Sequence, residues 1–148
     1  MSVEADWIDY NGHMNVAYYV LLFDRVVDQA LATIGLGPDY VRARALSYFT
    51  VELHVSYLRE LAAHVPVIGT AQLIGHDDKR IRLYLELIHA EEGWVAASAE
   101  ELFLHVDLAS RRAAPFPADI RTGLTAMQAA HAELPWPERA GRAIRLGS

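Results

Sequence analysis

A short stretch near the amino terminus gathers residue types that can do chemistry. Residues 7–15 read WIDYNGHMN and are followed at once by a long apolar run. A carboxylate such as Asp9 can act as a general base or a nucleophile, and a histidine such as His13 can orient it or carry protons. A structural explanation is equally available, because Asn11-Gly12 is a common turn pair and Asn15 a common helix N-cap. The stretch is therefore either a turn with a helix cap or part of an active site.

The segment after this stretch predicts one long helix. Residues 15–34 contain neither glycine nor proline, and the GLGP sequence that follows ends helices. The first two turns are apolar on nearly all sides and polar residues gather later, which predicts a mostly buried helix with one exposed strip. The start of a helix carries unpaired backbone N–H groups and partial positive charge. The polar stretch thus lies where an oxyanion can be stabilised.

Alternating apolar and polar residues predict the strands of a sheet. Residues 49–57 alternate most regularly, so one face of this strand is expected to carry Phe49, Val51, Leu53, Val55 and Tyr57. Further strands are predicted at 67–74, 80–88 and 94–108, and the polar HDDK turn joins the first two of these as a hairpin. The residues before Asp9 are expected to form a short first strand.

Together these elements predict an α+β fold in which a five-stranded antiparallel sheet wraps around one long central helix. A buried helix needs a second layer over its apolar surface, and a curled sheet provides it. A chain of 148 residues with 53% hydrophobic composition is expected to form one domain, with its core within about residues 1–110. Residues 118–133 predict a C-terminal helix, and the tail from about 115 to 148 is expected to pack outside the core.

Composition excludes several classes of partner. The formal charge of −6 comes from 19 acidic against 13 basic residues and disfavours nucleic acid. There is no cysteine, and the seven histidines lack the paired spacing of metal motifs, so we expect no metal and no bound cofactor. The N-terminus lacks the order of a signal peptide, and the longest apolar run, residues 16–23, is far short of the ~20 residues that span a bilayer. We therefore expect a cytoplasmic protein without a membrane partner.

The polar stretch and the helix after it resemble a known family, the hotdog-fold thioesterases of the 4-hydroxybenzoyl-CoA and acyl-carrier-protein type. The resemblance extends over about residues 1–110 and is carried by Asp9, Asn11, Gly12, His13 and Asn15 ahead of an aromatic-rich helix. It implies an enzyme that hydrolyses an acyl-CoA thioester to the free acid and coenzyme A. Within the family, the motifs WIDYNGHMN, SYFTVELHVSYL, DDKR and LHVD are similar to the betainyl-CoA thioesterases of carnitine breakdown. The HFPxxPxxPG motif of hotdog dehydratases is absent, so dehydration is disfavoured.

The resemblance implies a role for each polar residue of the stretch. Asp9 matches the catalytic acid, which activates water or attacks the thioester itself. A backbone amide near residues 15–17, at the start of the helix, polarises the carbonyl. Asn11 and His13 match a polar pair that positions water or the acid. Glu52 is a candidate for a second acid that such enzymes often place on a facing strand, although a solvated strand face explains it equally well.

The resemblance also implies contacts to the substrate. A trimethylammonium group is held by aromatic faces and an acid, and the predicted substrate-binding residues are Trp7, Asn15, Tyr18, Tyr19, Tyr48 and Glu52. Alternatively, these aromatic side chains fill the core, and the pocket takes medium-length or aryl acyl groups. The basic residues Lys79, Arg80 and Arg82 are predicted to contact the phosphates of coenzyme A, although hairpin charges of this kind also occur simply in solvent.

The sequence is compatible with more than one oligomeric state and with more than one kind of activity. In the family the active site lies where two central helices meet, which implies a homodimer or a homotetramer. The alternative to an enzyme is a non-catalytic hotdog module that binds an acyl-CoA as a sensor or assembly domain. The presence of Asp9 with Asn11 and His13 favours the enzyme. The sequence leaves open the acyl group, the role of Asp9 as base or nucleophile, and whether the chain is natively part of a longer polypeptide.

Overall fold

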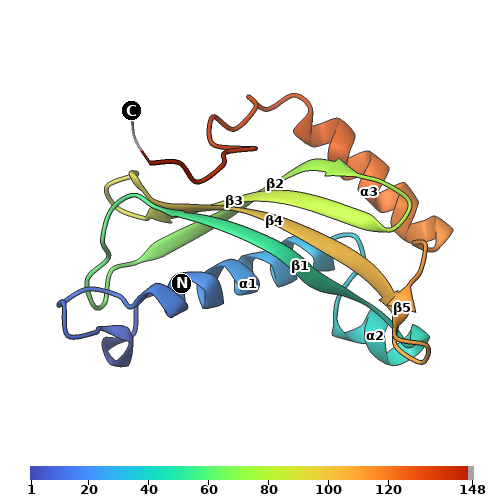
Figure 1. Ribbon diagram of the computed structural model, residues 1–148, viewed down its shortest axis with the longest axis horizontal. Coiled ribbons are helices and arrows are strands. Elements are labelled where there is room, and N and C mark those ends of the chain that lie inside the picture. Colours follow the sequence, from blue (N-terminus) through green and yellow to red (C-terminus); the bar gives the residue numbers. More distant parts are fainter. Residues whose placement is uncertain (147–148) are drawn as a thin grey trace.

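An antiparallel β-sheet with a long helix on one face forms the body of the protein (Figure 1). The computed structural model describes residues 1–146. Four strands of the sheet follow the order β1-β4-β3-β2, and a fifth, β5, pairs with β4. The strand bounds are β1 Leu46–Tyr57, β2 Val67–His76, β3 Arg80–His89, β4 Val95–Asp107 and β5 Arg112–Ala113. The predicted α+β class and five-stranded antiparallel sheet are therefore confirmed.

Helix α1, Val16–Ala32, supplies the apolar layer that one face of the sheet covers. Because its apolar residues recur at helical spacing, it buries Tyr19, Leu22, Phe23, Val26, Val27 and Leu31 against the sheet. The helix approaches β2 so closely that a Cβ atom on Gly69 would lie 2.0 Å from Val26 Cγ2. Position 69 therefore has to be glycine for α1 to rest on this strand.

The amino-terminal segment differs from the prediction. The residues before Asp9 do not form a regular first strand: backbone hydrogen bonds join residues 1–3 to residues 64–67, but the pairing amounts to an isolated bridge between Ser2 and Pro66. A short 3-10 helix, η1 at Ala5–Trp7, follows and leaves the Trp7 side chain only 5% exposed. The chain thus leaves the sheet edge early so that the large Trp7 ring can reach the core. The fifth strand of the sheet is the two-residue β5 instead.

Strand β1 contains a bulge that changes which residues face α1. Its pairing with β4 shifts register around Val51, so one extra residue is inserted there. On the C-terminal side of the bulge the predicted alternation is correct, because Leu53 packs on the core. On the N-terminal side it is wrong. On that side Tyr48 packs on the core, whereas Phe49 and Val51 are 38% and 52% exposed. These two apolar side chains lie on β1, which is an edge of the sheet.

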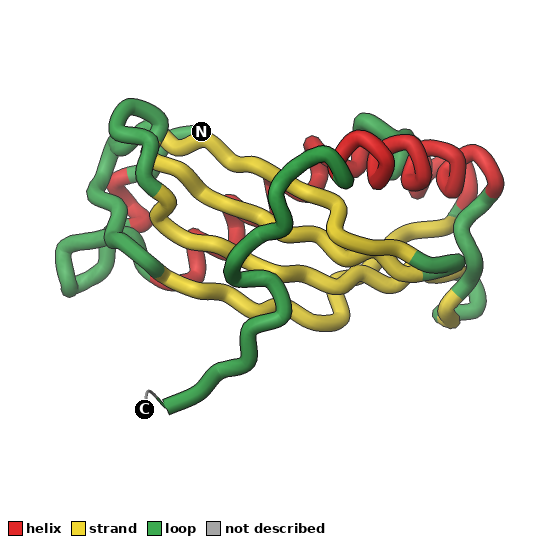
Figure 2. The backbone as a smooth tube through the Cα atoms, turned by 90° about the horizontal axis from the view of Figure 1, so that it is seen from above, coloured by secondary structure: helices red, strands yellow, loops and turns green. Residues whose placement is uncertain are grey.

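Two further helices lie around the sheet. Helix α2, Pro38–Arg44, was not predicted; it starts with proline at a position that tolerates it and is only seven residues long. Helix α3, Ala118–His131, confirms the predicted C-terminal helix and packs beside β2, where the His131 ring accepts from the Leu73 N–H at 2.8 Å. The chain then crosses the sheet face opposite α1, as Figure 2 shows, and the Gly141 N–H donates to the Glu100 carboxylate.

Neither a membrane span nor a metal site is found in residues 1–146. None of the helices in this range is long and apolar enough to cross a bilayer. In the same range, no three side chains of histidine, aspartate or glutamate come together in a way that could hold a metal ion.

Candidate active site

The polar stretch forms a closed loop immediately before α1. The Asp9 N–H donates to the His13 carbonyl at 3.1 Å, and the Gly12 N–H donates back to the Asp9 carbonyl at 3.0 Å. Gly12 has a φ of +83°, a left-handed conformation that favours glycine. The turn at Asn11-Gly12 is thus present, and it holds the backbones of Asp9 and His13 next to each other at the start of the helix.

Both oxygens of the Asp9 carboxylate accept hydrogen bonds from within this stretch. Oδ1 accepts from the Asn11 N–H at 2.8 Å, and Oδ2 accepts from the Asn15 side-chain amide at 3.3 Å. The Asn15 side-chain oxygen accepts in turn from the Ala17 N–H at 3.0 Å, as an N-cap does. One side chain therefore caps α1 and orients the carboxylate, so the cap does not exclude a role in chemistry.

One backbone donor at the start of α1 is left for a ligand. The N–H groups of Ala17 and Tyr18 both donate to Asn15, to its side chain and its carbonyl respectively. Val16 occupies the first helical position, where an N–H has no partner within the helix. Its N–H makes no hydrogen bond to any part of residues 1–146. With the positive end of the helix dipole behind it, the Val16 amide is well placed to stabilise an oxyanion.

A pocket of about 360 Å³ opens beside this amide, between the first turn of α1 and the end of β1. His13 lines it, and within residues 1–146 its ring makes one hydrogen bond, with Nδ1 3.3 Å from the Met14 carbonyl oxygen. A carbonyl only accepts, so Nδ1 carries the proton in this contact, and Nε2 makes no hydrogen bond within residues 1–146. The residues around the opening are His13, Met14, Val16, Tyr19, Tyr57, Leu58, Arg59 and Glu60.

The other predicted aromatic residues lie outside this pocket. Trp7 and Tyr18 stack with ring centroids 5.0 Å apart, and the Arg25 guanidinium lies over Trp7 at 5.4 Å. The Tyr48 hydroxyl donates to Asp28 at 3.1 Å, and burial, with Asp28 adding to it, raises the pKa of Tyr48. The structure therefore does not gather Trp7, Tyr18, Tyr19 and Tyr48 into one cage, because separate elements hold them in separate contacts.

Glu52 also lies apart from the loop. It lines a second hollow, of about 260 Å³, together with Arg82, Glu100 and residues of the C-terminal segment that crosses the outer face of the sheet. This position follows from the alternation of a strand, because Leu53 lies on the face that packs on the core and its neighbour Glu52 therefore points to the opposite face. Within one subunit, Glu52 therefore does not line the pocket beside the Asp9 loop, where a second acid was expected.

The basic residues predicted to contact coenzyme A lie at the other end of the sheet. Arg80 pairs with Leu104, whereas the end of β1 nearest the loop pairs with Ala97. Seven residues of strand separate these positions, roughly 23 Å at ~3.3 Å per residue. The Arg80 guanidinium forms an ion pair with Asp77 and lowers the pKa of that carboxyl to about 2. Arg82 pairs with Glu100, with its Nε donating at 2.7 Å.

A buried carboxylate on β4 was missed from the sequence. Glu101 is 6% exposed and accepts from the Thr50 hydroxyl at 2.7 Å. Burial raises the pKa of Glu101, the Thr50 hydrogen bond opposes that rise, and the charge of Asp24 on α1 adds to it. The signal was available, because two adjacent glutamates in a strand must point to opposite faces and one of them has to face inward.

Comparison with known proteins identifies the family to which the chain belongs. The model of the thioesterase-like superfamily matches residues 3–124. The chain belongs to this superfamily. A betainyl-CoA thioesterase of Pseudomonas aeruginosa is 38% identical over 144 residues, which are 97% of this chain and 91% of that protein. An L-carnitine dehydrogenase/betainyl-CoA thioesterase of Rhizobium meliloti is 39% identical over 143 residues, which are 97% of this chain and 29% of that longer protein.

Solved structures agree with the family. A Staphylococcus aureus protein in complex with CoA has a TM-score of 0.92 at 29% identity, covering 99% of this chain and 92% of that one. A Pseudomonas putida protein has a TM-score of 0.85 at 34% identity, with 100% and 94% covered. The chain is a hotdog-fold thioester hydrolase of the acyl-CoA thioesterase type. These matches favour an enzyme over a non-catalytic acyl-CoA-binding module.

Proposed function

We propose that this chain hydrolyses betainyl-CoA, a thioester whose acyl group is small and permanently cationic. The Pseudomonas aeruginosa relative of that name aligns over nearly all of both chains. The observation that carries the proposal is the Asp9 carboxylate, which the polar loop holds at the start of α1 beside a pocket whose lining includes two tyrosines, Glu60 and Arg59. In this proposal the reaction takes place in the cytoplasm and yields betaine and coenzyme A.

Asp9 and the start of α1 divide the chemistry between them. The thioester carbonyl oxygen faces the Val16 N–H, and Asp9 takes a proton from the water that attacks the carbonyl carbon. The negative charge that develops on the carbonyl oxygen is stabilised by the amide and by the positive end of the helix. The C–S bond then breaks, and the departing thiolate recovers the proton from Asp9. Asn11 and the His13 Nε2 position the water and the carboxylate.

Direct attack by Asp9 is the second route. The carboxylate displaces the thiolate and forms a mixed anhydride, which water then hydrolyses to the free acid. Both routes require an ionised carboxylate within reach of the carbonyl carbon, so both make Asp9 the residue on which turnover depends.

The proposal includes a homodimer, or a homotetramer built from it. The evidence is a side of the molecule with exposed apolar residues from two elements, Val16 and Val20 of α1 and Phe49 and Val51 of β1, which are between 37% and 55% exposed. Because β1 is an edge strand, its backbone can also pair with a second copy. Light scattering at micromolar concentration is expected to give at least twice the 16.5 kDa chain mass, and a monomer alone would contradict this part of the proposal.

The basic hairpin has a role only across such a pair. Lys79, Arg80 and Arg82 are proposed to contact the phosphates of coenzyme A, although they lie at the far end of the sheet from Asp9 of the same subunit. If two β1 edges pair antiparallel, the far end of one subunit comes to the loop end of the other. Lys79→Ala is then expected to raise KM for acyl-CoA without lowering kcat. An unchanged KM would remove this hairpin from the site.

A panel of thioesters tests the substrate. The quaternary nitrogen of betainyl-CoA is replaced by carbon in 3,3-dimethylbutyryl-CoA, which keeps the shape and loses the charge. We expect kcat/KM to be higher for betainyl-CoA by roughly tenfold or more, the scale of about 1.4 kcal/mol of cation recognition in the transition state. Equal values, or a preference for octanoyl- or benzoyl-CoA, would be compatible with a thioesterase but would contradict betainyl-CoA as its substrate.

A further inference from the structure

The pocket beside the Val16 amide contains three side chains that were not among the predicted site residues, Tyr57, Arg59 and Glu60. They come from the last residue of β1 and the turn after it. The pocket is at the small end of the ~300–1,000 Å³ range of ligand sites, and His13 and Val16 on its wall join it directly to the Asp9 loop. An acyl group whose carbonyl meets the Val16 amide therefore has this pocket next to it.

Two tyrosines form a corner of the pocket. The rings of Tyr19 and Tyr57 have centroids 5.2 Å apart and planes at 86°, so they stand as perpendicular walls. Backbone groups fix both hydroxyls, since Tyr19 accepts from the Leu61 N–H at 3.2 Å and Tyr57 donates to the Val16 carbonyl at 3.5 Å. Tyr19 is almost fully buried and forms the back wall, whereas Tyr57 is 47% exposed and offers an open face.

A negative charge accompanies this corner. Burial is the main cause of the raised pKa of Tyr19, but the Glu60 carboxylate is close enough to add to it. Within residues 1–146 Glu60 takes part in no ion pair. Arg59 also lines the pocket, and its guanidinium lies over the Trp94 ring at 4.0 Å. Perpendicular aromatic walls with a nearby carboxylate are the features that hold a quaternary ammonium ion.

We propose that this pocket binds the trimethylammonium end of the acyl group, with Tyr57 and Tyr19 as its aromatic walls and Glu60 as its counter-charge. This assignment rests on the proposed betainyl-CoA hydrolysis. It replaces the earlier candidates for physical reasons: Arg25 already covers the Trp7–Tyr18 stack, and Glu52 lies on the other face of the sheet. The pocket residues thus determine which acyl group is accepted, while Asp9 and the Val16 amide act on its carbonyl.

The test compares the ratio of kcat/KM for betainyl-CoA to that for 3,3-dimethylbutyryl-CoA in several variants. Glu60→Gln removes the charge at constant size, and Tyr57→Leu removes the open aromatic face. Each is expected to lower the ratio roughly three- to tenfold, with the rate on the uncharged thioester largely kept. Tyr57→Phe keeps the ring and is expected to keep the ratio. Glu52→Gln is the matched control, because it removes a carboxylate from the opposite face of the sheet.

The outcomes separate this inference from the function on which it rests. If the wild-type protein hydrolyses neither thioester nor other acyl-CoAs, the proposed function fails. If it prefers the cationic thioester but Glu60→Gln and Tyr57→Leu leave the ratio unchanged, or Glu52→Gln lowers it as much, the pocket assignment is overturned. Thermal unfolding of each variant identifies any that does not fold, and Glu60→Gln, at an exposed position, keeps the test decisive if Tyr57→Leu is lost.

Discussion

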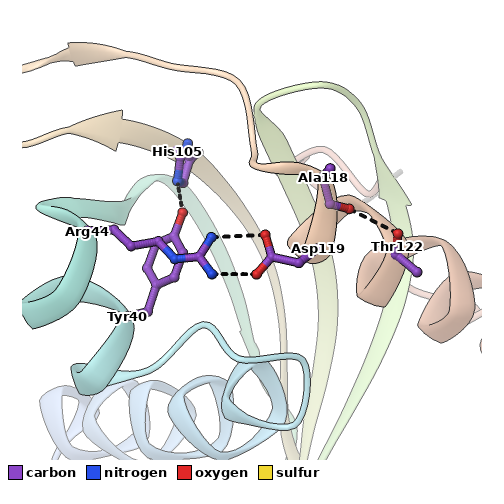
Figure 3. Close-up of polar contacts among 6 residues, drawn as sticks. All are labelled: Tyr40, Arg44, His105, Ala118, Asp119 and Thr122. Carbon is purple, nitrogen blue, oxygen red and sulfur yellow. Dashed lines mark hydrogen bonds and ion pairs between the residues drawn. The ribbon is translucent and has the colours of Figure 1, made fainter.

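The two ends of the sheet contain similar kinds of residue, but they leave very different bonding capacity for a ligand. At the end beside α2, the Tyr40 hydroxyl lies 2.7 Å from His105 Nε2, and His105 Nδ1 lies 2.8 Å from the Ala114 carbonyl (Figure 3). Both rings are buried. The Arg44 guanidinium meets both carboxylate oxygens of Asp119 on the surface nearby. Each of these polar side chains is paired with a neighbour.

The end beside the Asp9 loop, in contrast, has hydrogen-bonding groups without a partner in the described part of the chain. The Val16 N–H has no partner in residues 1–146, His13 keeps one ring nitrogen for a ligand, and a pocket adjoins both. Histidine, tyrosine and carboxylate together therefore do not identify a functional site. What distinguishes one is hydrogen-bonding capacity left beside an accessible space, and the following variants test that difference.

The largest effect among these variants is expected at Asn15. Asn15→Asp keeps a good N-cap, so the unfolding temperature should hardly change. It also removes the amide that donates to Asp9 and places a second negative charge there, so kcat should fall about 10- to 100-fold. Asn15→Ala is the control that loses the cap as well, at ~1 kcal/mol of stability. Full activity in a folded Asn15→Asp protein would show that this side chain only caps the helix.

The reverse result, a loss of stability without a loss of activity, is expected at the end of the sheet beside α2. Tyr40→Phe leaves the buried His105 Nε2 without its donor, which should cost ~1–3 kcal/mol in the free energy of unfolding. Steady-state kinetics of the folded variant should match the wild type, because α2, which contains Tyr40, lies at the other end of the sheet from the segment that precedes α1 (Figure 1). Denaturant titration gives the first quantity. A stable but inactive Tyr40→Phe protein would contradict the division between the two ends.

Lowering the pH should reduce the free energy of unfolding through His105, at the end of the sheet beside α2. Burial lowers the pKa of His105, although its hydrogen bond to the Ala114 carbonyl opposes that shift. A lowered folded-state pKa means that the unfolded chain binds the proton first. The contribution to stability is therefore complete above the unfolded value of ~6.5 and is lost as pH falls toward the folded pKa. Unfolding free energies measured from pH 7.5 to pH 5 should fall less in His105→Gln than in the wild type.

The smallest effect is expected from the ion pair in Figure 3. Arg44 and Asp119 are 39% and 56% exposed, so solvent screens their attraction even though the contact is bidentate. Arg44→Gln should change neither kcat/KM nor, beyond a small shift, the unfolding temperature, and raising the salt concentration should remove that shift. A large destabilisation would mean that this end depends on its surface charges as much as on the buried Tyr40–His105 pair.

Most of the fold followed from local patterns. Helix α1, the four long strands and α3 are where periodicity predicted them, because each buries one apolar face. The misses depend on tertiary contacts: Trp7 reaches the core through a 3-10 turn, and a bulge near Val51 reverses the faces of β1. Neither a single-residue insertion nor a two-residue strand such as β5 leaves a periodic signal in the sequence.

The candidate site was predicted unevenly for the same reason. The loop residues from Asp9 to Asn15 are close in sequence, and the structure gathers them at the helix start. Tyr57 and Glu60 join them only because β1 returns beside α1, a contact over about forty residues that no local pattern describes. Glu52 was proposed from the family resemblance, and the structure places it on the outer face of the sheet, whereas the acid at the pocket is Glu60, in the turn after β1.

Turnover by Asp9→Asn tests the account most directly. The substitution keeps the size of the side chain and an oxygen that accepts the Asn11 hydrogen bond, but it removes the negative charge that a base or a nucleophile requires. The account predicts that kcat on betainyl-CoA, or on the best thioester of the panel, falls by ~100-fold or more. The binding of coenzyme A should stay the same and the unfolding temperature should change little, because only the 3.3 Å hydrogen bond from the Asn15 amide loses its acceptor. Unchanged turnover in the folded variant would contradict the account, because the chemistry would then have to lie elsewhere in the molecule.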